Sequence, residues 1–428
     1  MAKTKGGNLC AMQLWRQIRG NTYFREPLTF SRLICGIENR PGGPHIYDRQ
    51  IRRALLRDDL KPARLKAIIN RIGGKNEIQT IVRELAGGVA DFSDRTPLTN
   101  LELIRSVLRA GLCRDTNKIR LWIANENQKL GLFFHNSLKP LELVIYHAHS
   151  EIDELYDLTV RRGLRPAAIV SSGSGEMVND VCDKEWFQKE LEIIQWSRSQ
   201  EVPYFGICFG QQALGYQAFG VMPVYHKIPE GVTHERHSDK SLLVTPGVKR
   251  MIYGSRMITA NPFNPKLHPV MKGVSQVECL EAHSMGFELG GGTSTIPLDK
   301  IQAVSLDHFY NVNGPTAEIT RLIVEVIADG YAVGVQPHPE LTAQVLILLL
   351  ELPRLAEALV AEGQDLESMR ADLRRYCPNK YSAGERLGYN FFKFVMAPNL
   401  IAWLHDAGLI SADLARQMLE QRFGGMSV

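Results

Sequence analysis

A short apolar segment that runs straight into a glycine-flanked cysteine places the strongest constraint on the fold of this chain. Residues 202–207 read VPYFGI, and Cys208 follows at once, with Gly206 two positions before it and Gly210 two positions after it. The run is typical of a buried strand, and glycines on both sides of a residue permit the sharp turn that carries a strand into a helix. The segment therefore predicts a sheet whose strands alternate with helices.

The surrounding sequence continues this alternation. Segments typical of strands and helices occur in turn at 119–124 (strand), 141–147 (strand), 151–162 (helix), 167–170 (strand) and 186–197 (helix). Strands separated by helices in this way form parallel sheets through right-handed crossovers. Further β-like segments extend as far as His338. We therefore expect an α/β fold with an open, mostly parallel sheet and flanking helices.

Both ends of the chain are predicted to be helical. Four apolar residues between positions 65 and 72 recur at helical spacing, and helical patterns return from residue 342 onward. The apolar stretch 389–397, YNFFKFVMA, favours packing against the sheet domain, and a docking surface for a partner is the alternative. The predicted organisation is a helical N-terminal domain at 1–117, an α/β domain at 118–350 and a helical C-terminal region at 351–428.

Composition excludes several classes of protein. The 428 residues are 44% hydrophobic and 22% charged, which is ordinary for a globular protein. No uninterrupted apolar run reaches about 18 residues, so no membrane span is predicted. The N-terminus lacks the apolar core of a secretory signal, which makes the cytoplasm the expected location. The seven cysteines are scattered and indicate neither a disulfide framework nor a zinc site.

The first 75 residues are strongly basic, with sixteen Lys and Arg against five Asp and Glu. A segment of this kind can bind nucleic acid. A solvated basic helical surface is the favoured interpretation, because no recognised nucleic-acid motif accompanies the charge.

The position of Cys208 suits a nucleophile. At a helix N-terminus the free N–H groups and the dipole stabilise a thiolate, and the N–H of Phe209 would point toward a developing oxyanion. A cysteine nucleophile also needs a base, and the base needs an orienting group. His338 and Glu340, two residues apart beyond a predicted strand, supply both. A buried structural cysteine is the alternative, which the flanking glycines disfavour.

A third element is the loop SSGSG at residues 171–175, which ends the predicted strand at 167–170. Open sheets bind ligands at loops of this kind, and Gly173 can bring a backbone N–H close to a reacting carbonyl. A phosphate-binding turn is the alternative. The third glycine of GxGxxG and the lysine of a P-loop are both missing.

Taken in chain order, these elements resemble the class I, or triad, glutamine amidotransferase family. The resemblance rests on the loop 171–175, the GxCxGxQ segment 206–212, the EAHSM segment 281–285 and the HPE motif 338–340. It covers roughly residues 118–350 and implies the flavodoxin-like fold of that family. The sequence departs from the family at Ser172 and Ser174, where glycine and proline are frequent, and at Pro337, where an aromatic residue is usual.

The resemblance implies hydrolysis of the side-chain amide of L-glutamine through a cysteine thioester, with release of ammonia. It assigns no cofactor and no metal ligand. The residues that it assigns are Cys208, His338 and Glu340 as the catalytic triad, Gly173 and Phe209 as the oxyanion hole, and Gln212, His283 and Ser284 as substrate contacts.

Three further histidines, His226, His234 and His237, lie between the cysteine turn and His283. Their spacing matches neither a helix face nor a strand face. A solvated loop is therefore favoured over a metal site.

The destination of the ammonia is not encoded in a recognisable motif. The chain has neither GxxxxGK[ST] nor an SGGxDS-type pyrophosphatase loop, so we expect a separate acceptor-activating synthase as partner. Two alternatives remain open, a stand-alone hydrolase of γ-glutamyl conjugates and a non-catalytic regulatory protein on the same scaffold. The presence of all three triad residues argues against the second.

Overall fold

The structure is a computed structural model of the 428-residue chain. It describes residues 31–39, 122–123, 141–237, 240–289, 296–311, 319–339, 341, 343–350, 353–375 and 383–423. The helices predicted between residues 40 and 117 lie outside this described part.

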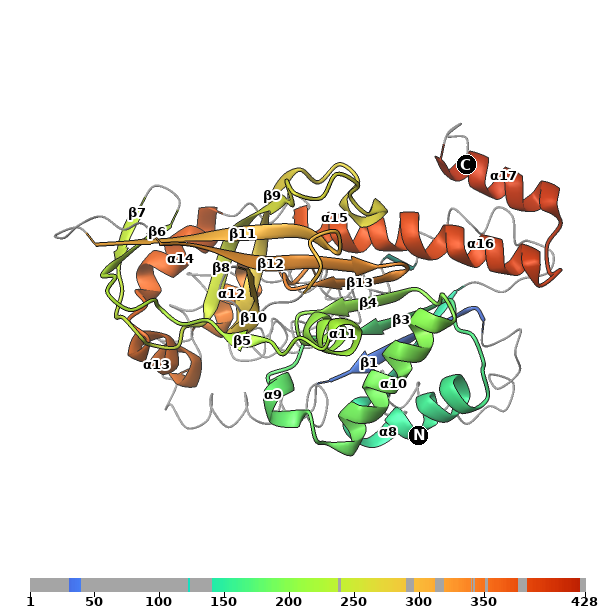
Figure 1. The fold of residues 1–428 in the computed structure, drawn as a ribbon, viewed down its shortest axis with the longest axis horizontal. Helices are drawn as coiled ribbons and strands as arrows, with labels where there is room; N and C mark the ends of the chain where they lie inside the picture. Colours follow the sequence, from blue (N-terminus) through green and yellow to red (C-terminus); the bar gives the residue numbers. More distant parts are fainter. Residues whose placement is uncertain are drawn as a thin grey trace, which may run out of the picture.

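Five parallel strands form the centre of the molecule, with the spatial order β2-β1-β3-β4-β13 (Figure 1). Each pairs in register with its neighbour, as Ile207 does with Val335. Their bounds are β1 (Leu33–Glu38), β2 (Glu142–His147), β3 (Ala168–Ser171), β4 (Tyr204–Ile207) and β13 (Ala332–Val335).

Strand β1 comes from the part of the chain that the sequence assigns to a helical N-terminal domain. It lies between β2 and β3 and pairs with both. The expectation of an all-helical segment therefore does not hold for residues 33–38, and the organisation of the rest of 1–117 stays a prediction. The sequence also predicts a strand at 119–124. Two residues of this segment are described, Trp122 and Ile123, and the prediction is wrong for them because both are helical.

An antiparallel extension continues the sheet beyond β13 in the order β12-β11-β6-β7, with β10 and β5 branching from β12, and β8 and β9 branching from β11. The sheet is therefore mixed, with a parallel centre, and the predicted α/β class is confirmed. The bounds are β5 (Val224–Tyr225), β6 (His234–His237), β7 (Lys240–Leu243), β8 (Ile252–Ala260), β9 (Gln276–His283), β10 (Met285–Leu289), β11 (Ile301–Tyr310) and β12 (Ile319–Asp329).

Helices cover one face of the parallel strands between β2 and β13. Alternate strand residues, such as Cys35 and Ile37, point to this face and pack with Ile152, Phe187 and Leu214 of its helices. The elements are α8 (Ala148–Tyr156), η2 (Asp157–Arg161), α9 (Val178–Val181), α10 (Glu185–Ser199) and α11 (Phe209–Phe219).

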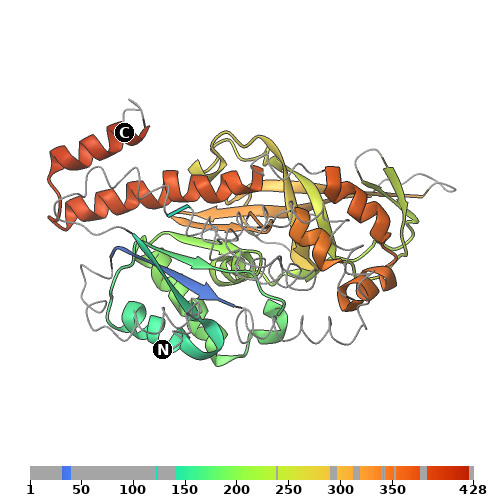
Figure 2. The same cartoon turned by 180° about the vertical axis from the view of Figure 1, so that it is seen from behind.

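The C-terminal helices lie on the opposite face (Figures 1 and 2). The ring of Phe391 stacks on Phe205 of β4 at 4.7 Å between centroids, and Phe392 is also fully buried. The apolar stretch 389–397 therefore packs inside this chain, as favoured. The elements are α15 (Ala383–Asn390), η4 (Phe391–Met396), α16 (Ala397–Asp406) and α17 (Ala412–Phe423).

A second group of helices follows β13 and lies beside β8. Tyr253 of β8 donates its hydroxyl to the carbonyl of Leu346 at 2.6 Å, which ties the two together. These helices and the short turn after β8 are α12 (Ala343–Leu349), α13 (Pro353–Ala361), α14 (Leu366–Arg375) and η3 (Pro269–Met271). Of the helices described, none has the length and apolar character needed to cross a membrane.

Candidate active site

The three motifs singled out in the sequence emerge side by side at one edge of the parallel sheet. Ser171 at the end of β3 pairs with Gly206 of β4, and Ile207 of β4 pairs with Val335 of β13. Parallel neighbours carry their C-terminal loops at the same edge. The loop after β3, the cysteine after β4 and the histidine after β13 are therefore brought together by strand pairing alone.

Cys208 occupies a strained turn between β4 and α11. Its backbone has φ 51° and ψ −102°, a conformation that side chains other than glycine rarely adopt. The turn is tight because a Cβ on Gly206 would collide with the backbone of Gly210, and a Cβ on Gly210 would lie 2.7 Å from the carbonyl oxygen of Ser171. The two flanking glycines are thus required by close approach, as the sequence predicted.

Phe209 opens the helix that follows the cysteine. As the first residue of α11 its N–H has no acceptor within the helix, and the dipole adds positive potential there. Its ring is buried and meets Phe187 edge-on, with 5.5 Å between centroids. The side chain anchors the turn, while the backbone N–H remains the predicted oxyanion donor.

Gly173 lies between the predicted nucleophile and the predicted base. A Cβ at this position would stand 3.1 Å from Cε1 of His338 and 3.5 Å from Cβ of Cys208. His338 is buried, and its backbone N–H donates to the carbonyl of Leu280 at 2.9 Å. The structure therefore brings Cys208, Gly173 and His338 together. Glu340, the predicted orienting carboxylate, lies outside the described residues.

Gln336 is a site residue that sequence reasoning did not single out. Its Nε2 donates to Sγ of Cys208 at 3.4 Å, and its Oε1 accepts from Nε2 of Gln212 at 3.3 Å. Gln212 also donates to the carbonyl of Met285 at 2.9 Å. The available signal was positional, because Gln336 follows β13 directly and Cys208 follows the strand beside it.

A buried network supports the loop after β3. Ser171 donates its hydroxyl to Oε1 of Glu190 at 2.7 Å, and Nδ2 of Asn39 donates to Ser171 at 2.8 Å and to the carbonyl of Ser172 at 3.1 Å. Burial raises the pKa of Glu190 to about 7. Asn39 directly follows β1, so the loop that carries Gly173 is held by the strand inserted from the N-terminal part of the chain.

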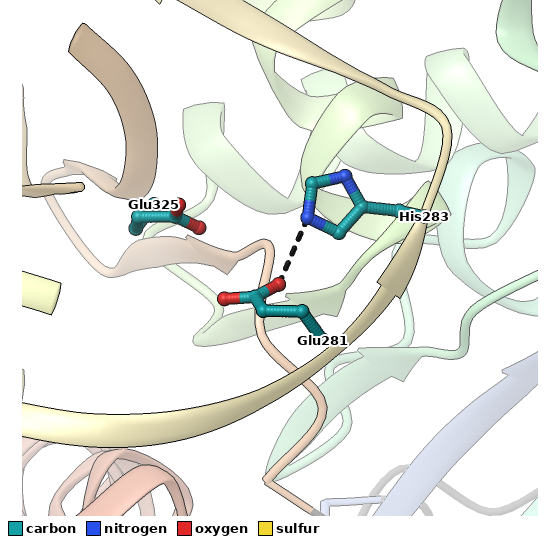
Figure 3. Close-up of side chains that lie close together, drawn as sticks. All are labelled: Glu281, His283 and Glu325. Atoms are coloured by element: carbon teal, nitrogen blue, oxygen red, sulfur yellow. Dashed lines mark ion pairs between the residues drawn. The ribbon is translucent and has the colours of Figure 1, made fainter. Parts of the chain in front are cut away.

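His283 is bound to internal partners rather than presented at an open surface. Its Nδ1 lies 3.0 Å from the carbonyl of Met285, and its Nε2 lies 2.9 Å from Oε2 of Glu281, with Glu325 opposite (Figure 3). Burial raises the pKa of Glu281 to about 7 and that of Glu325 to about 8, and it lowers the pKa of His283 to about 4. The predicted contact of this imidazole with substrate would require these bonds to change.

Ser284, the neighbouring predicted substrate contact, is half-buried, and its carbonyl accepts from the N–H of His226 at 3.0 Å. His226 is fully buried, with Nδ1 2.9 Å from Oε1 of Glu288 and Nε2 3.3 Å from Nδ1 of His283. The expectation of a solvated loop is wrong for His226, because tertiary packing buries it. His234 and His237 belong to strand β6.

Comparison with known proteins gives a family match over the region that contains these motifs. Residues 138–346 match the model of the family described as "Glutamine amidotransferase class-I". A CTP synthase from Pyrobaculum calidifontis is 24% identical over 268 residues, which cover 60% of this chain and 42% of that protein. The chain thus spans less than half the length of this curated relative.

Two solved structures are similar over most of their own length. A glutamine amidotransferase from Thermotoga maritima has 12% identity and a TM-score of 0.34, covering 62% of this chain and 90% of that one. The glutaminase domain of Trypanosoma brucei CTPS with bound acivicin has 12% identity and a TM-score of 0.30, covering 56% and 90%.

Proposed function

We propose that this chain, whose residues 138–346 belong to the class-I glutamine amidotransferase family, hydrolyses L-glutamine with Cys208 as nucleophile and His338 as general base. The observation that carries the proposal is the strained backbone of Cys208 at φ 51°, with Gly173 against both Cys208 and His338. A buried structural cysteine has no need of such a turn, since strain of this kind costs on the order of 1–3 kcal/mol.

The first half of the reaction forms a thioester. His338 takes the thiol proton, and Sγ of Cys208 attacks the side-chain carbonyl carbon of glutamine. The backbone N–H groups of Gly173 and Phe209 stabilise the negative oxygen of the tetrahedral intermediate. The intermediate collapses when the carbon–nitrogen bond breaks, and the proton held by His338 passes to the leaving nitrogen, which departs as ammonia.

The second half releases glutamate. His338 takes a proton from water, the resulting hydroxide attacks the thioester carbonyl, and the carbon–sulfur bond breaks. The sulfur regains a proton from His338, so the enzyme returns to its starting state. Glu340 orients the imidazole in this scheme, while Gln212 and the segment with His283 and Ser284 border the glutamine.

The ammonia passes to a separate acceptor-activating synthase. The relative from Pyrobaculum calidifontis is named as a CTP synthase, which supports an ammonia-using partner without identifying this chain's acceptor. Four cysteines, Cys35, Cys182, Cys208 and Cys279, are free thiols. Free thiols suit a reducing compartment, and we place the activity in the cytoplasm.

The test is glutamate release from L-glutamine by the purified chain. Cys208→Ala should lower turnover at least about 1,000-fold, and His338→Ala should come close to this loss, because nucleophile and base act as one unit. Glu340→Ala should be milder, because loss of the orienting group alone costs less than loss of the nucleophile or the base. Cys182→Ala, which removes a half-exposed cysteine in another loop, is the matched control and should keep full activity.

Normal turnover by Cys208→Ala would refute the mechanism. If the native chain releases no glutamate, labelling by a glutamine-like electrophile distinguishes the remaining interpretations. Labelling of Cys208 indicates an active site gated by its partner or a preference for γ-glutamyl conjugates, whereas no labelling indicates a non-catalytic scaffold.

A further inference from the structure

Three buried side chains beneath the active site point toward one another (Figure 3). Glu281 and His283 lie at the end of β9, and Glu325 lies on β12. Their exposed fractions are 0%, 5% and 0%. One nitrogen or oxygen atom from each lies within 4.8 Å of the other two. Side chains of these types are metal ligands, and here they converge where water does not reach.

The hydrogen bond of His283 fixes its tautomer so that the lone pair of Nε2 points into this cluster. Its Nδ1 lies 3.0 Å from the carbonyl oxygen of Met285, which can only accept, so Nδ1 carries the hydrogen. In the neutral ring Nε2 is then an acceptor, and it faces a carboxylate oxygen of Glu281 at 2.9 Å. Among the described residues Nε2 makes no further polar contact, and Glu281 otherwise shares a side-chain hydrogen bond with Glu325. Two facing acceptors need a proton or a metal cation between them.

The charge of Arg256 acts to lower the pKa of both Glu281 and Glu325, but its direct partners are other groups. Arg256 forms its ion pair with Asp307 and donates to the hydroxyl of Ser305 at 3.0 Å. Within the described part of the chain, no lysine or arginine forms an ion pair with Glu281 or Glu325. Burial raises the pKa of Glu281 to about 7 and that of Glu325 to about 8, so ionising both is costly, and a divalent cation that displaces their protons would neutralise both.

We propose that Glu281, His283 and Glu325 bind one divalent transition-metal ion of the Zn²⁺ or Mn²⁺ type. Bonds of about 2.0–2.2 Å hold the ligand atoms of such an ion roughly 3–4 Å apart, which small side-chain movements achieve here. Oε2 of Glu325 has no hydrogen-bond partner among the described residues and completes the set. The bond from Nδ1 to Met285 orients the imidazole, as outer partners of metal-bound histidines do.

The ion would join two strands that do not pair with each other. Strand β9 pairs with β8, whereas β12 pairs with β10, β11 and β13. The residue before Glu281 is Leu280, whose carbonyl accepts the backbone N–H of His338 at 2.9 Å. A metal that fixes the end of β9 against β12 therefore also fixes the backbone of the proposed base. Its role is to position the site, since neither Cys208 nor His338 is among its ligands.

The test uses the full chain with Cys208→Ala, because a catalytic thiolate can itself bind Zn²⁺. The protein is stripped with a chelator, loaded with Zn²⁺ or Mn²⁺, desalted and analysed for metal by mass spectrometry. About one ion per chain should remain, and Tm should rise by several degrees, because a ligand that binds only the folded state stabilises it. Adding Glu325→Gln should abolish both effects. Adding Glu288→Gln, a neighbouring carboxylate outside the cluster, should preserve them.

A measurement on the native cluster covers the case in which Glu325→Gln does not fold. The electron spin echo of bound Mn²⁺ should contain coupling to one imidazole nitrogen, and Glu281→Gln should remove that signal. Retention of no metal, equal retention by Glu325→Gln, or a Mn²⁺ signal without nitrogen coupling would each overturn the proposal. None of these readouts involves glutamine, so their outcome is independent of the proposed activity.

Discussion

At the scale of single residues, the candidate site depends on the groups that face the sulfur of Cys208. The strained turn sets the direction of this buried side chain, and Gly173 leaves room for His338 beside it. Gln336 adds a donor, since its Nε2 points at the sulfur from the end of the adjacent strand. A donor to an anion contributes more than a neutral hydrogen bond, so Gln336 should matter mostly when the thiolate forms.

Replacing Gln336 tests this role. Gln336→Leu should slow alkylation of Cys208 at neutral pH about tenfold, because the thiolate loses a donor while the side-chain size is nearly kept. Gln336→Glu, which places an acceptor beside the sulfur, should slow it further. The rate is followed by mass spectrometry of the peptide that contains Cys208, with Tm as the check on folding. Equal rates in the native chain and Gln336→Leu would exclude the role.

At the scale of elements, helix α10 supports the loop that follows β3. Glu190 reaches from this helix to Ser171 at the end of β3, and Asn39 joins them from the end of β1. The carboxyl group is fully buried, and burial raises its pKa from 4.5 to about 7. An acid that is buried in this way holds its proton in the folded state at a pH where the unfolded chain has released it.

The consequence is a loss of stability as pH rises. The contribution of Glu190 to the free energy of unfolding is fully present below pH 4.5. This contribution is lost as the pH rises through about 7. Glu190→Gln keeps an acceptor for Ser171 but cannot ionise, so the variant should gain on the order of 3 kcal/mol relative to the native chain between pH 4.5 and 8. Urea denaturation at both pH values measures this. A difference between the two proteins that does not vary with pH would contradict the assignment.

At the scale of the whole molecule, the N-terminal strand is part of the sheet that carries the candidate active site. Strand β1 lies between β2 and β3, and the family match at residues 138–346 begins after it. The C-terminal helices are integrated in the same way, since Phe391 and Phe392 are buried against the sheet. The candidate active site is therefore held by segments from both ends of the described chain.

Interrupting β1 should accordingly unfold the sheet domain. Ile34 is fully buried and pairs with Leu143 on one side and Ala168 on the other. Ile34→Pro removes an N–H from a strand with neighbours on both sides, so no cooperative unfolding transition and no glutamate release are expected. Ile34→Val, which removes one methylene, should cost only about 1 kcal/mol. A folded, active Ile34→Pro protein would mean that β1 is dispensable.

The sequence by itself determined the local chemistry. The signals around Cys208 are local: an apolar run comes before it and glycines flank it. His338 likewise follows directly after a strand. The parallel pairing of β3, β4 and β13 then brings these segments together. The α/β class and the buried stretch 389–397 were predictable for the same reason, because both depend on apolar periodicity. The assignments of the catalytic triad, of the oxyanion hole and of the substrate contacts all stay predictions.

Only the tertiary structure decided which distant segments meet. A six-residue apolar strand such as β1 resembles any other short apolar run, and its insertion between β2 and β3 depends on pairing across more than a hundred residues. Glu190, Glu281 and Glu325 look like surface acids in the sequence, where Glu is rarely buried. Their burial follows from neighbours that no local pattern specifies, and this burial raises their pKa values beside the candidate active site.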